Sequence, residues 1–167
     1  MSTLLKLFML SLFFIPSFSP ADQNLRKEPV RIFKGNSHYS SDILFCVSKG
    51  KVYKGRSPYS SDVVCTVDGY KIRKGNSPYS SDILFTIKGD NIYKGRSSYS
   101  SDIVANFRGD KLHRGTSPYS SDILVNIGDD GKIYSGRSRY SSDVIASCMG
   151  GLSREELVAV LYCLGIF

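Results

Sequence analysis

Tyrosine, serine and aspartate recur together along most of this chain, at a spacing that would build six equivalent binding sites. The pattern is Gly-x-Ser-x-Tyr-Ser-Ser-Asp, and in five of the six copies a lysine or arginine directly precedes the glycine. Aromatic rings beside hydroxyls and cations suit sugar rings or anionic polymers, and weak equivalent sites gain avidity when the ligand also repeats. The candidate ligand-binding residues are Tyr39, Tyr59, Tyr79, Tyr99, Tyr119, Tyr140, Lys34, Lys54, Lys74, Lys94 and Arg114.

The same pattern has a purely structural interpretation, which the sequence favours because every repeat meets its neighbour alike. The glycine permits backbone conformations that other residues resist. Serine and aspartate side chains bond to nearby backbone groups in turns. Each tyrosine would then pack between neighbouring hairpins with its hydroxyl bonded to an adjacent loop, and the cations would only protect strand ends. Burial or exposure of the tyrosines therefore separates the two interpretations.

Catalysis and metal binding find little support in the sequence. His38 and His113 each occur in one repeat only, and neither belongs to a nucleophile motif. A single aspartate per repeat, with no acidic partner at a loop spacing, does not make a calcium site. No Cys-x-x-Cys or Cys/His spacing indicates a metal. We expect no enzyme activity and no metal or cofactor, the alternative being a secreted hydrolase.

The elements that position these residues follow from the period of the pattern. Successive tyrosines are 20 residues apart four times and 21 once, which is typical of a repeat architecture. Asp68-Gly69 between apolar runs predicts a β-hairpin with a two-residue turn. Such a turn sets Cys65 opposite Ile72, on the side of the ribbon that also carries Val67. The extra residue of the 21-residue spacing falls in another such turn, at 128–131.

The ends of the repeat array predict a closed ring. Residues 31–34 form a strand with no hairpin partner before it, and residues 144–148 form one with no partner after it. Joined, with Ile145 opposite Phe33, they complete a sixth hairpin and remove exposed sheet edges. The predicted fold class is all-β: six tandem β-hairpin repeats closed into a toroid, with one short C-terminal α-helix. The alternative is an open β-hairpin solenoid, which would need atypical terminal repeats as caps.

The C-terminal segment, residues 150–167, predicts a capped and buried helix. Ser153 and Glu156 form a capping box, flanked by Leu152 and Leu157 as a hydrophobic staple. The helix that follows is apolar on every side, and such helices are buried. We expect it to plug or cover the toroid of a monomer, the alternative being that it docks on another subunit.

The N-terminal 21 residues have the layout of a secretory signal peptide, with an apolar run over 7–15 and a cut before Asp22. The apolar run is well short of the ~20 residues that a membrane span requires. The prediction is therefore a secreted or periplasmic protein with a linker over 22–30 and a hairpin domain over 31–149. Removal of Lys6, the only charge in the signal peptide, changes the net charge from +7 to +6, and a basic protein is drawn to anionic partners.

An exported protein is free to form disulfides, and this chain carries four cysteines. Cys46, Cys65, Cys148 and Cys163 allow three complete pairings, among which the sequence does not choose. Cys148 with Cys163 is the pair we select, because it would tie the tail to the last strand.

The repeat over residues 92–106, Ile-Tyr-Lys-Gly-Arg-Ser-Ser-Tyr-Ser-Ser-Asp-Ile-Val-Ala-Asn, resembles short tandem repeats of functionally uncharacterised bacterial proteins. Those proteins also tend to end in Gly-Gly and an apolar helix, and the ring of hairpins is similar in idea to the β-flower proteins. The resemblance covers residues 31–167 and implies no activity. Choline-binding repeats share the period, but this chain has no tryptophan for their ligand cages.

Together these features predict an exported, non-enzymatic protein that is either an envelope-associated binding module or a structural scaffold. The partner we expect is a polysaccharide or an anionic envelope polymer rather than a specific nucleic acid. Membrane contact would be limited to the signal peptide.

Overall fold

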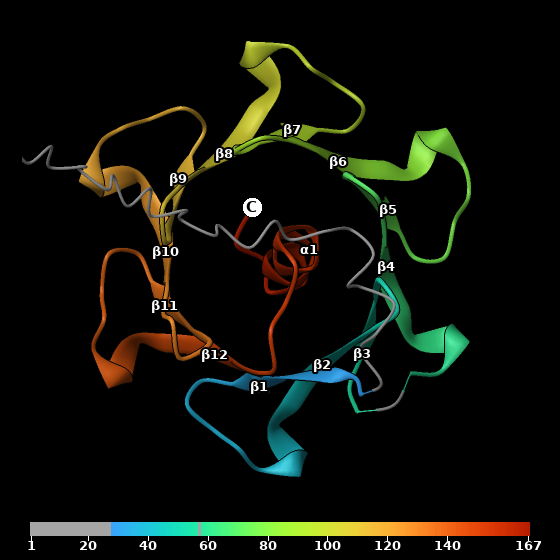
Figure 1. Ribbon diagram of the computed structural model, residues 1–167, viewed down its shortest axis with the longest axis vertical. Coiled ribbons are helices and arrows are strands. Elements are labelled where there is room, and N and C mark those ends of the chain that lie inside the picture. Colours follow the sequence, from blue (N-terminus) through green and yellow to red (C-terminus); the bar gives the residue numbers. More distant parts are fainter. Residues whose placement is uncertain (1–27, 57) are drawn as a thin grey trace, which may run out of the picture.

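The structure, a computed structural model, describes residues 28–56 and 58–167 of the chain. Within these residues, twelve antiparallel strands follow one another round a closed sheet, and helix α1 (Arg154–Cys163) stands at its centre (Figure 1). The predicted signal peptide, residues 1–21, lies outside the described residues.

The strands run up and down between two edges of the ring. They are β1 (Val30–Lys34), β2 (Ile43–Ser48), β3 (Lys51–Lys54), β4 (Val63–Asp68), β5 (Lys71–Lys74), β6 (Ile83–Lys88), β7 (Asn91–Lys94), β8 (Ile103–Arg108), β9 (Lys111–Arg114), β10 (Ile123–Ile127), β11 (Lys132–Ser135) and β12 (Val144–Met149). The edge with the tight turns at 49–50, 69–70, 89–90, 109–110 and 128–131 is called the turn rim below. The opposite edge, with the longer loops 35–42, 55–62, 75–82, 95–102, 115–122 and 136–143, is the loop rim.

The two ends of the sheet meet, as the sequence predicted. Strand β1 pairs antiparallel with β12, and Phe33 lies opposite Ser147. The Gly35 N–H continues the pairing with a 2.8 Å hydrogen bond to the Ile145 carbonyl. The toroid is therefore confirmed, and the open solenoid is wrong. Closure leaves no free strand edge among the described strands, which removes the main hazard of an exposed sheet.

The hairpin register differs from the predicted one by two residues. Asp68 remains in β4 opposite Lys71, so the turn is Gly69-Tyr70, and Val67 rather than Cys65 faces Ile72. The reason is that Gly69 has φ +57° and takes the first turn position, as glycine does in a type II′ hairpin turn. The same offset moves the partner of Phe33 from Ile145 to Ser147.

The offset is an even number of residues, so the predicted faces of the ribbon are preserved. The inward side chains form a belt that is 0–1% exposed: Ile32, Val52, Cys65, Ile72, Ile92, Ala105, Leu112, Val125, Ile133 and Ala146. Because this belt faces the ring axis, it forms one continuous core with whatever fills the centre.

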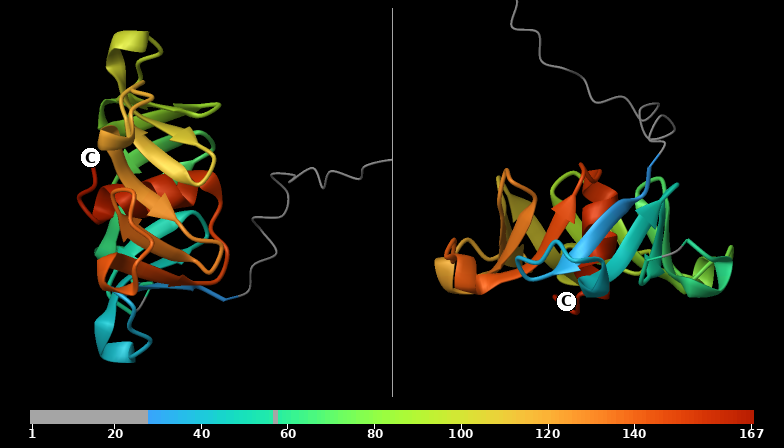
Figure 2. Two further views of the ribbon diagram at one scale, coloured as in Figure 1. Left: turned by 90° about the vertical axis from the view of Figure 1, so that its left-hand side faces the viewer. Right: turned by 90° about the horizontal axis from the view of Figure 1, so that it is seen from below.

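Helix α1 fills the centre, upright along the ring axis (Figure 2). Val158, Ala159, Val160 and Leu161 have no exposed surface, and the helix lies closest to β3, β4 and β5. The plug predicted from its apolar composition is thus what the structure contains. No helix among the described residues is long and apolar enough to cross a membrane.

Local interactions define both ends of α1. Ser153 Oγ accepts the Glu156 N–H at 3.2 Å, and Glu156 Oε2 accepts the Ser153 N–H at 2.9 Å, which confirms the capping box. At the other end Gly165, with φ +75°, closes the helix through a bond from the Ile166 N–H to the Leu161 carbonyl. The helix therefore has the length that its own sequence dictates.

Candidate binding rim

Five of the six loops of the loop rim are each held by their own serine and aspartate. In loop 75–82, the Ser77 hydroxyl donates to Asp82 Oδ2 at 2.5 Å and accepts the Tyr79 N–H at 3.2 Å. The Asp82 N–H donates to the Tyr79 carbonyl at 3.2 Å and starts a single 3₁₀ turn, η4 (Ser80–Asp82). The same serine–aspartate bond occurs in four other loops: Ser37–Asp42, Ser97–Asp102, Ser117–Asp122 and Ser138–Asp143.

This bonding directs the tyrosine side chain away from the ring. The Tyr79 N–H and carbonyl both bond into the loop, and its backbone is extended, with φ −75° and ψ 141°. Because the N–H and the carbonyl of Tyr79 both bond within the loop, its side chain points to solvent. The tyrosines at this position are between 67% and 77% exposed: Tyr39, Tyr59, Tyr79, Tyr99, Tyr119 and Tyr140.

The structural interpretation of the pattern therefore applies to the serine and the aspartate but not to the tyrosine. None of the six tyrosines is buried between neighbouring hairpins. Tyrosines do occur beneath the loops, but they belong to the strands: Tyr53, Tyr93 and Tyr134 are 8–9% exposed on the outer face of the sheet. Burial of this kind thus belongs to the strand tyrosines and not to the loop tyrosines.

Cations stand at the base of the same loops. Lys34, Lys54, Lys74, Lys94 and Arg114 are the last residues of their strands and are exposed. None of the five forms an ion pair with another described residue. The sequence-based candidates omitted a second set of exposed cations two positions further on, Arg56, Arg96 and Arg137, which alternate loops carry.

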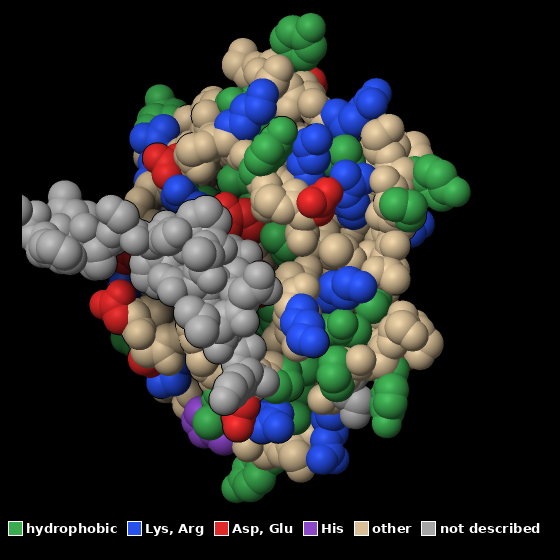
Figure 3. All heavy atoms as spheres, turned by 45° about the vertical axis from the view of Figure 1, so that its right-hand side comes forward, with side chains coloured by type: hydrophobic (Ala, Val, Ile, Leu, Met, Phe, Trp, Pro, Cys, Tyr) green, Lys and Arg blue, Asp and Glu red, His purple; other side chains and the backbone are tan. Residues whose placement is uncertain are grey.

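The loops project radially like petals, so aromatic and cationic groups surround the ring (Figure 1). In a space-filling view, hydrophobic side chains stand out singly at the edge, with Lys and Arg side chains among them (Figure 3). The structure thus places the eleven predicted residues at one rim, in six similar settings.

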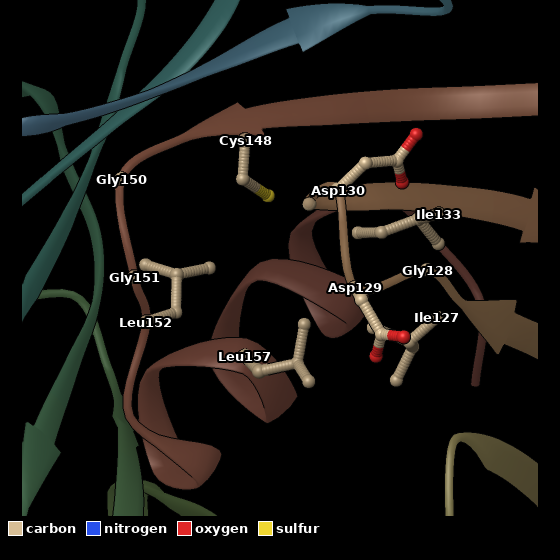
Figure 4. Close-up of a pocket in the computed structure, with 11 residues that line it drawn as sticks. Ile127, Gly128, Asp129, Asp130, Ile133, Cys148, Gly150, Gly151, Leu152 and Leu157 are labelled. Atoms are coloured by element: carbon tan, nitrogen blue, oxygen red, sulfur yellow. The ribbon is translucent and has the colours of Figure 1, made fainter.

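A separate hollow lies at the turn rim, between the turn at 128–131 and the start of helix α1. Its volume is about 360 Å³, and its apolar wall consists of Ile127, Ile133, Leu152 and Leu157 (Figure 4). Asp129 and Asp130 stand at the same hollow, and Lys132, 2.9 Å from Asp130, lowers the pKa of the Asp130 carboxyl through its hydrogen bond. Burial raises the pKa of the Cys148 thiol beside them to about 11.

The histidines lie in different sectors of the ring. The His38 ring is exposed and meets Phe33 edge-on, with 6.2 Å between ring centroids. His113, on β9, is 5% exposed, and its Nδ1 has no hydrogen-bond partner. Over residues 28–56 and 58–167, no three His, Cys, Asp or Glu side chains are grouped closely enough to hold a metal ion.

The cysteines are not arranged as the sequence suggested. All four are free thiols, and Cys163 lies 3.6 Å from Cys65, sulfur to sulfur. Cys148 lines the hollow near the start of α1, whereas Cys163 ends the helix. The Cys148–Cys163 pair is therefore not the one that the fold brings together, because the length of α1 lies between the two residues.

A closed ring of six similar hairpins, plugged by a helix and fringed by six loops of one sequence, defines the class of protein to which this chain belongs. The family model of the 6-fold beta flower proteins matches residues 32–161, and the chain is a member of that family. The predicted resemblance is confirmed. No curated protein and no solved structure matches the chain.

Proposed function

We propose that this is an exported, non-enzymatic binding module whose loop rim holds an extended polysaccharide or anionic envelope polymer through several weak contacts. The observation that carries the proposal is the exposure of all six loop tyrosines, at 67–77%. A scaffold would have no need for a large aromatic side chain at each of these points. Export rests on the signal-peptide pattern of residues 1–21.

The loops are suited to binding because they are ordered before a ligand arrives. In loop 75–82, Ser77, Tyr79 and Asp82 are linked by three hydrogen bonds within eight residues. A pre-ordered loop loses little conformational entropy on binding. Tyrosine adds a rigid, amphipathic contact surface at a low entropy cost of its own. The rim therefore offers stacking faces for sugar rings and hydroxyls for hydrogen bonds.

Affinity in this arrangement depends on the length of the ligand. A single tyrosine–cation contact of about millimolar Kd is worth roughly 4 kcal/mol. A polymer that reaches a second and third loop converts later contacts into intramolecular ones, and avidity exceeds the single-site affinity by about 10² or more. Short oligomers should bind weakly and long polymers tightly, with a rise at the length that spans neighbouring loops.

The test is a binding screen of immobilised neutral and acidic polysaccharides and anionic envelope polymers, followed by a length series of any hit. We expect Tyr79→Ala, Tyr99→Ala and Tyr119→Ala, combined, to reduce the affinity for the long polymer at least tenfold without a change in melting temperature. Tyr70→Ala is the matched control, because Tyr70 is 53% exposed at the turn rim. If no polymer binds, or if the control lowers affinity equally, the proposal is wrong.

Salt dependence separates the two ligand classes. The five cations at the strand ends carry no ion pair with described residues, so an anionic polymer would contact them directly. Binding of an anionic polymer should weaken steeply between low and physiological salt, because exposed charges are screened over about 8–10 Å. Binding of a neutral glycan should change little. Lys74→Gln with Lys94→Gln should weaken only the anionic case.

A further inference from the structure

Two cysteines far apart in the sequence meet inside the ring. Cys65 lies on the inner face of β4 and is 0% exposed, and Cys163 is the last residue of α1. Their sulfurs are 3.6 Å apart, although 98 residues separate them along the chain. Cys65 Sγ also lies 3.9 Å from the Ala159 carbonyl oxygen, so the thiol faces the helix directly.

The other two cysteines have no such neighbour. Cys46 is opposite Tyr53 in the β2–β3 pair, with its side chain on the outer face of the sheet. Cys148 is opposite Ile32 and faces the hollow at the turn rim. Because the sheet itself separates Cys46 from Cys148, the fold selects one pair among the four cysteines.

We propose that Cys65 and Cys163 form a disulfide that fastens the plug helix to the ring wall. Both S–H bonds are lost, one Sγ–Sγ bond forms, and two protons and two electrons leave. The electrons pass to the disulfide of an oxidant, either a protein dithiol–disulfide oxidase of an exporting compartment or oxidised glutathione, which becomes two thiols. Half-buried Cys163 attacks the oxidant first, and Cys65 then displaces the reduced oxidant from Cys163.

Bond formation needs a small local movement. A disulfide has a sulfur–sulfur distance of about 2.05 Å, so the two sulfurs must approach by roughly 1.5 Å. Cys163 is the last residue of α1 and stands two positions before Gly165, which has no other group within 4 Å of where a Cβ would lie. Cys65 remains in its strand, paired with Lys74 and Val52.

The bond would complete the attachment of the plug. At the turn rim, Arg154 already anchors the start of α1 through a 2.6 Å bond to Asp90 and a stack 4.6 Å from the centre of the Phe107 ring. At the loop rim, α1 is held by apolar and aromatic contacts, such as Tyr162 against Phe85 at 5.4 Å. The disulfide supplies the covalent link at this second end.

The environment of Cys65 also sets the kinetics. The hydrogen bond with Cys163, together with burial, raises the pKa of the Cys65 thiol, so the reactive thiolate is scarce in the folded state. Oxidation of the folded, reduced protein should therefore be slower than that of an exposed thiol, and unfolding followed by refolding in the same buffer should speed it.

The experiment is a thiol map of the full chain. The protein is equilibrated with oxidised glutathione, quenched with acid, and alkylated under denaturing conditions without reductant. We expect Cys46 and Cys148 to be alkylated, and a peptide carrying Cys65 to be linked to one carrying Cys163, 2 Da below the reduced mass. Four alkylated cysteines, or a different linked pair, would overturn the proposal.

Melting temperatures provide the second readout. In the wild-type protein and in the controls Cys46→Ala and Cys148→Ala, dithiothreitol should lower the melting temperature by an amount of the order of 10 °C. In Cys163→Ala, dithiothreitol should have no effect. The thiol map uses the unaltered chain, so the proposal stays testable if a variant fails to fold.

Discussion

At the residue scale, the loop residues divide into those that hold the loop together and one, the tyrosine, whose side chain faces solvent. Ser77 and Asp82 bond to each other, and the hydroxyl also holds the Tyr79 backbone. The Tyr79 side chain takes part in neither bond, and the residue is 70% exposed. A structural constraint therefore explains the repetition of serine and aspartate, while the repetition of tyrosine is what the proposed binding function would explain.

Removing one serine hydroxyl should loosen one loop. Ser77→Ala deletes a bond to a carboxylate, which is typically worth about 1.5–3 kcal/mol, reduced here by partial exposure to solvent. We expect a loss of about 1–2 kcal/mol in the free energy of unfolding, with faster amide exchange at Tyr79 and Asp82. Chemical denaturation and hydrogen exchange measure the two effects.

Ser80→Ala is the control, because Ser80 is exposed and its hydroxyl bonds to no described residue. Equal effects of the two substitutions would show that the serine–aspartate bond does not order the loop.

At the scale of the element, α1 determines whether the ring has a core. A ring of twelve strands presents its inward belt to the axis, and Leu161, with no exposed surface, meets that belt from the helix. The helix makes few polar contacts along its length, so apolar packing holds it in place. Its stability contribution therefore depends on buried volume.

Truncating a buried leucine of α1 should be costly. Leu161→Ala leaves a cavity and should lower the free energy of unfolding by about 2–5 kcal/mol. Leu164→Ala, with the same chemistry at a half-buried position, should cost clearly less. Thermal or chemical denaturation makes the comparison.

Leu161→Asp extends this test. An unpaired carboxylate in the core should prevent folding or cause aggregation. A Leu161→Asp protein as stable and as monomeric as the parent would mean that α1 does not plug the ring in solution.

At the scale of the whole molecule, stability depends on joining the two ends of the sheet. Strand β1 pairs with β2 on one side and β12 on the other, so it is the only bridge between the first and last repeats of the described chain. An open ring would expose two strand edges and the inward belt together.

Deletion of residues 30–34 should therefore destabilise the entire domain and promote aggregation, because it unpairs β2 and β12 at once. Differential scanning calorimetry and light scattering provide the measurements. Lys34→Ala retains all backbone pairs of β1 and should melt near the parent temperature. An unchanged melting temperature for the deletion would contradict closure.

Much of this molecule followed from local rules in the sequence. The 20-residue period, the two faces of each hairpin, the closing sixth hairpin and the Ser153–Glu156 capping box each depend on neighbours within a few residues or on simple repetition. The hairpin register was two residues off because Gly69 takes the first turn position rather than the second, a choice set by backbone twist.

Two features were decided by the tertiary structure. The loop pattern alone favoured a tyrosine packed between hairpins, and this prediction was wrong because the hydrogen bonds on both sides of Tyr79 turn that side chain outward. The partner of Cys163 could not be inferred from sequence distance, because the helix runs back through the ring and ends beside Cys65 of β4. Both outcomes depend on where separate elements meet in space. These meeting points are fixed by the closed ring and cannot be read from a sequence that repeats.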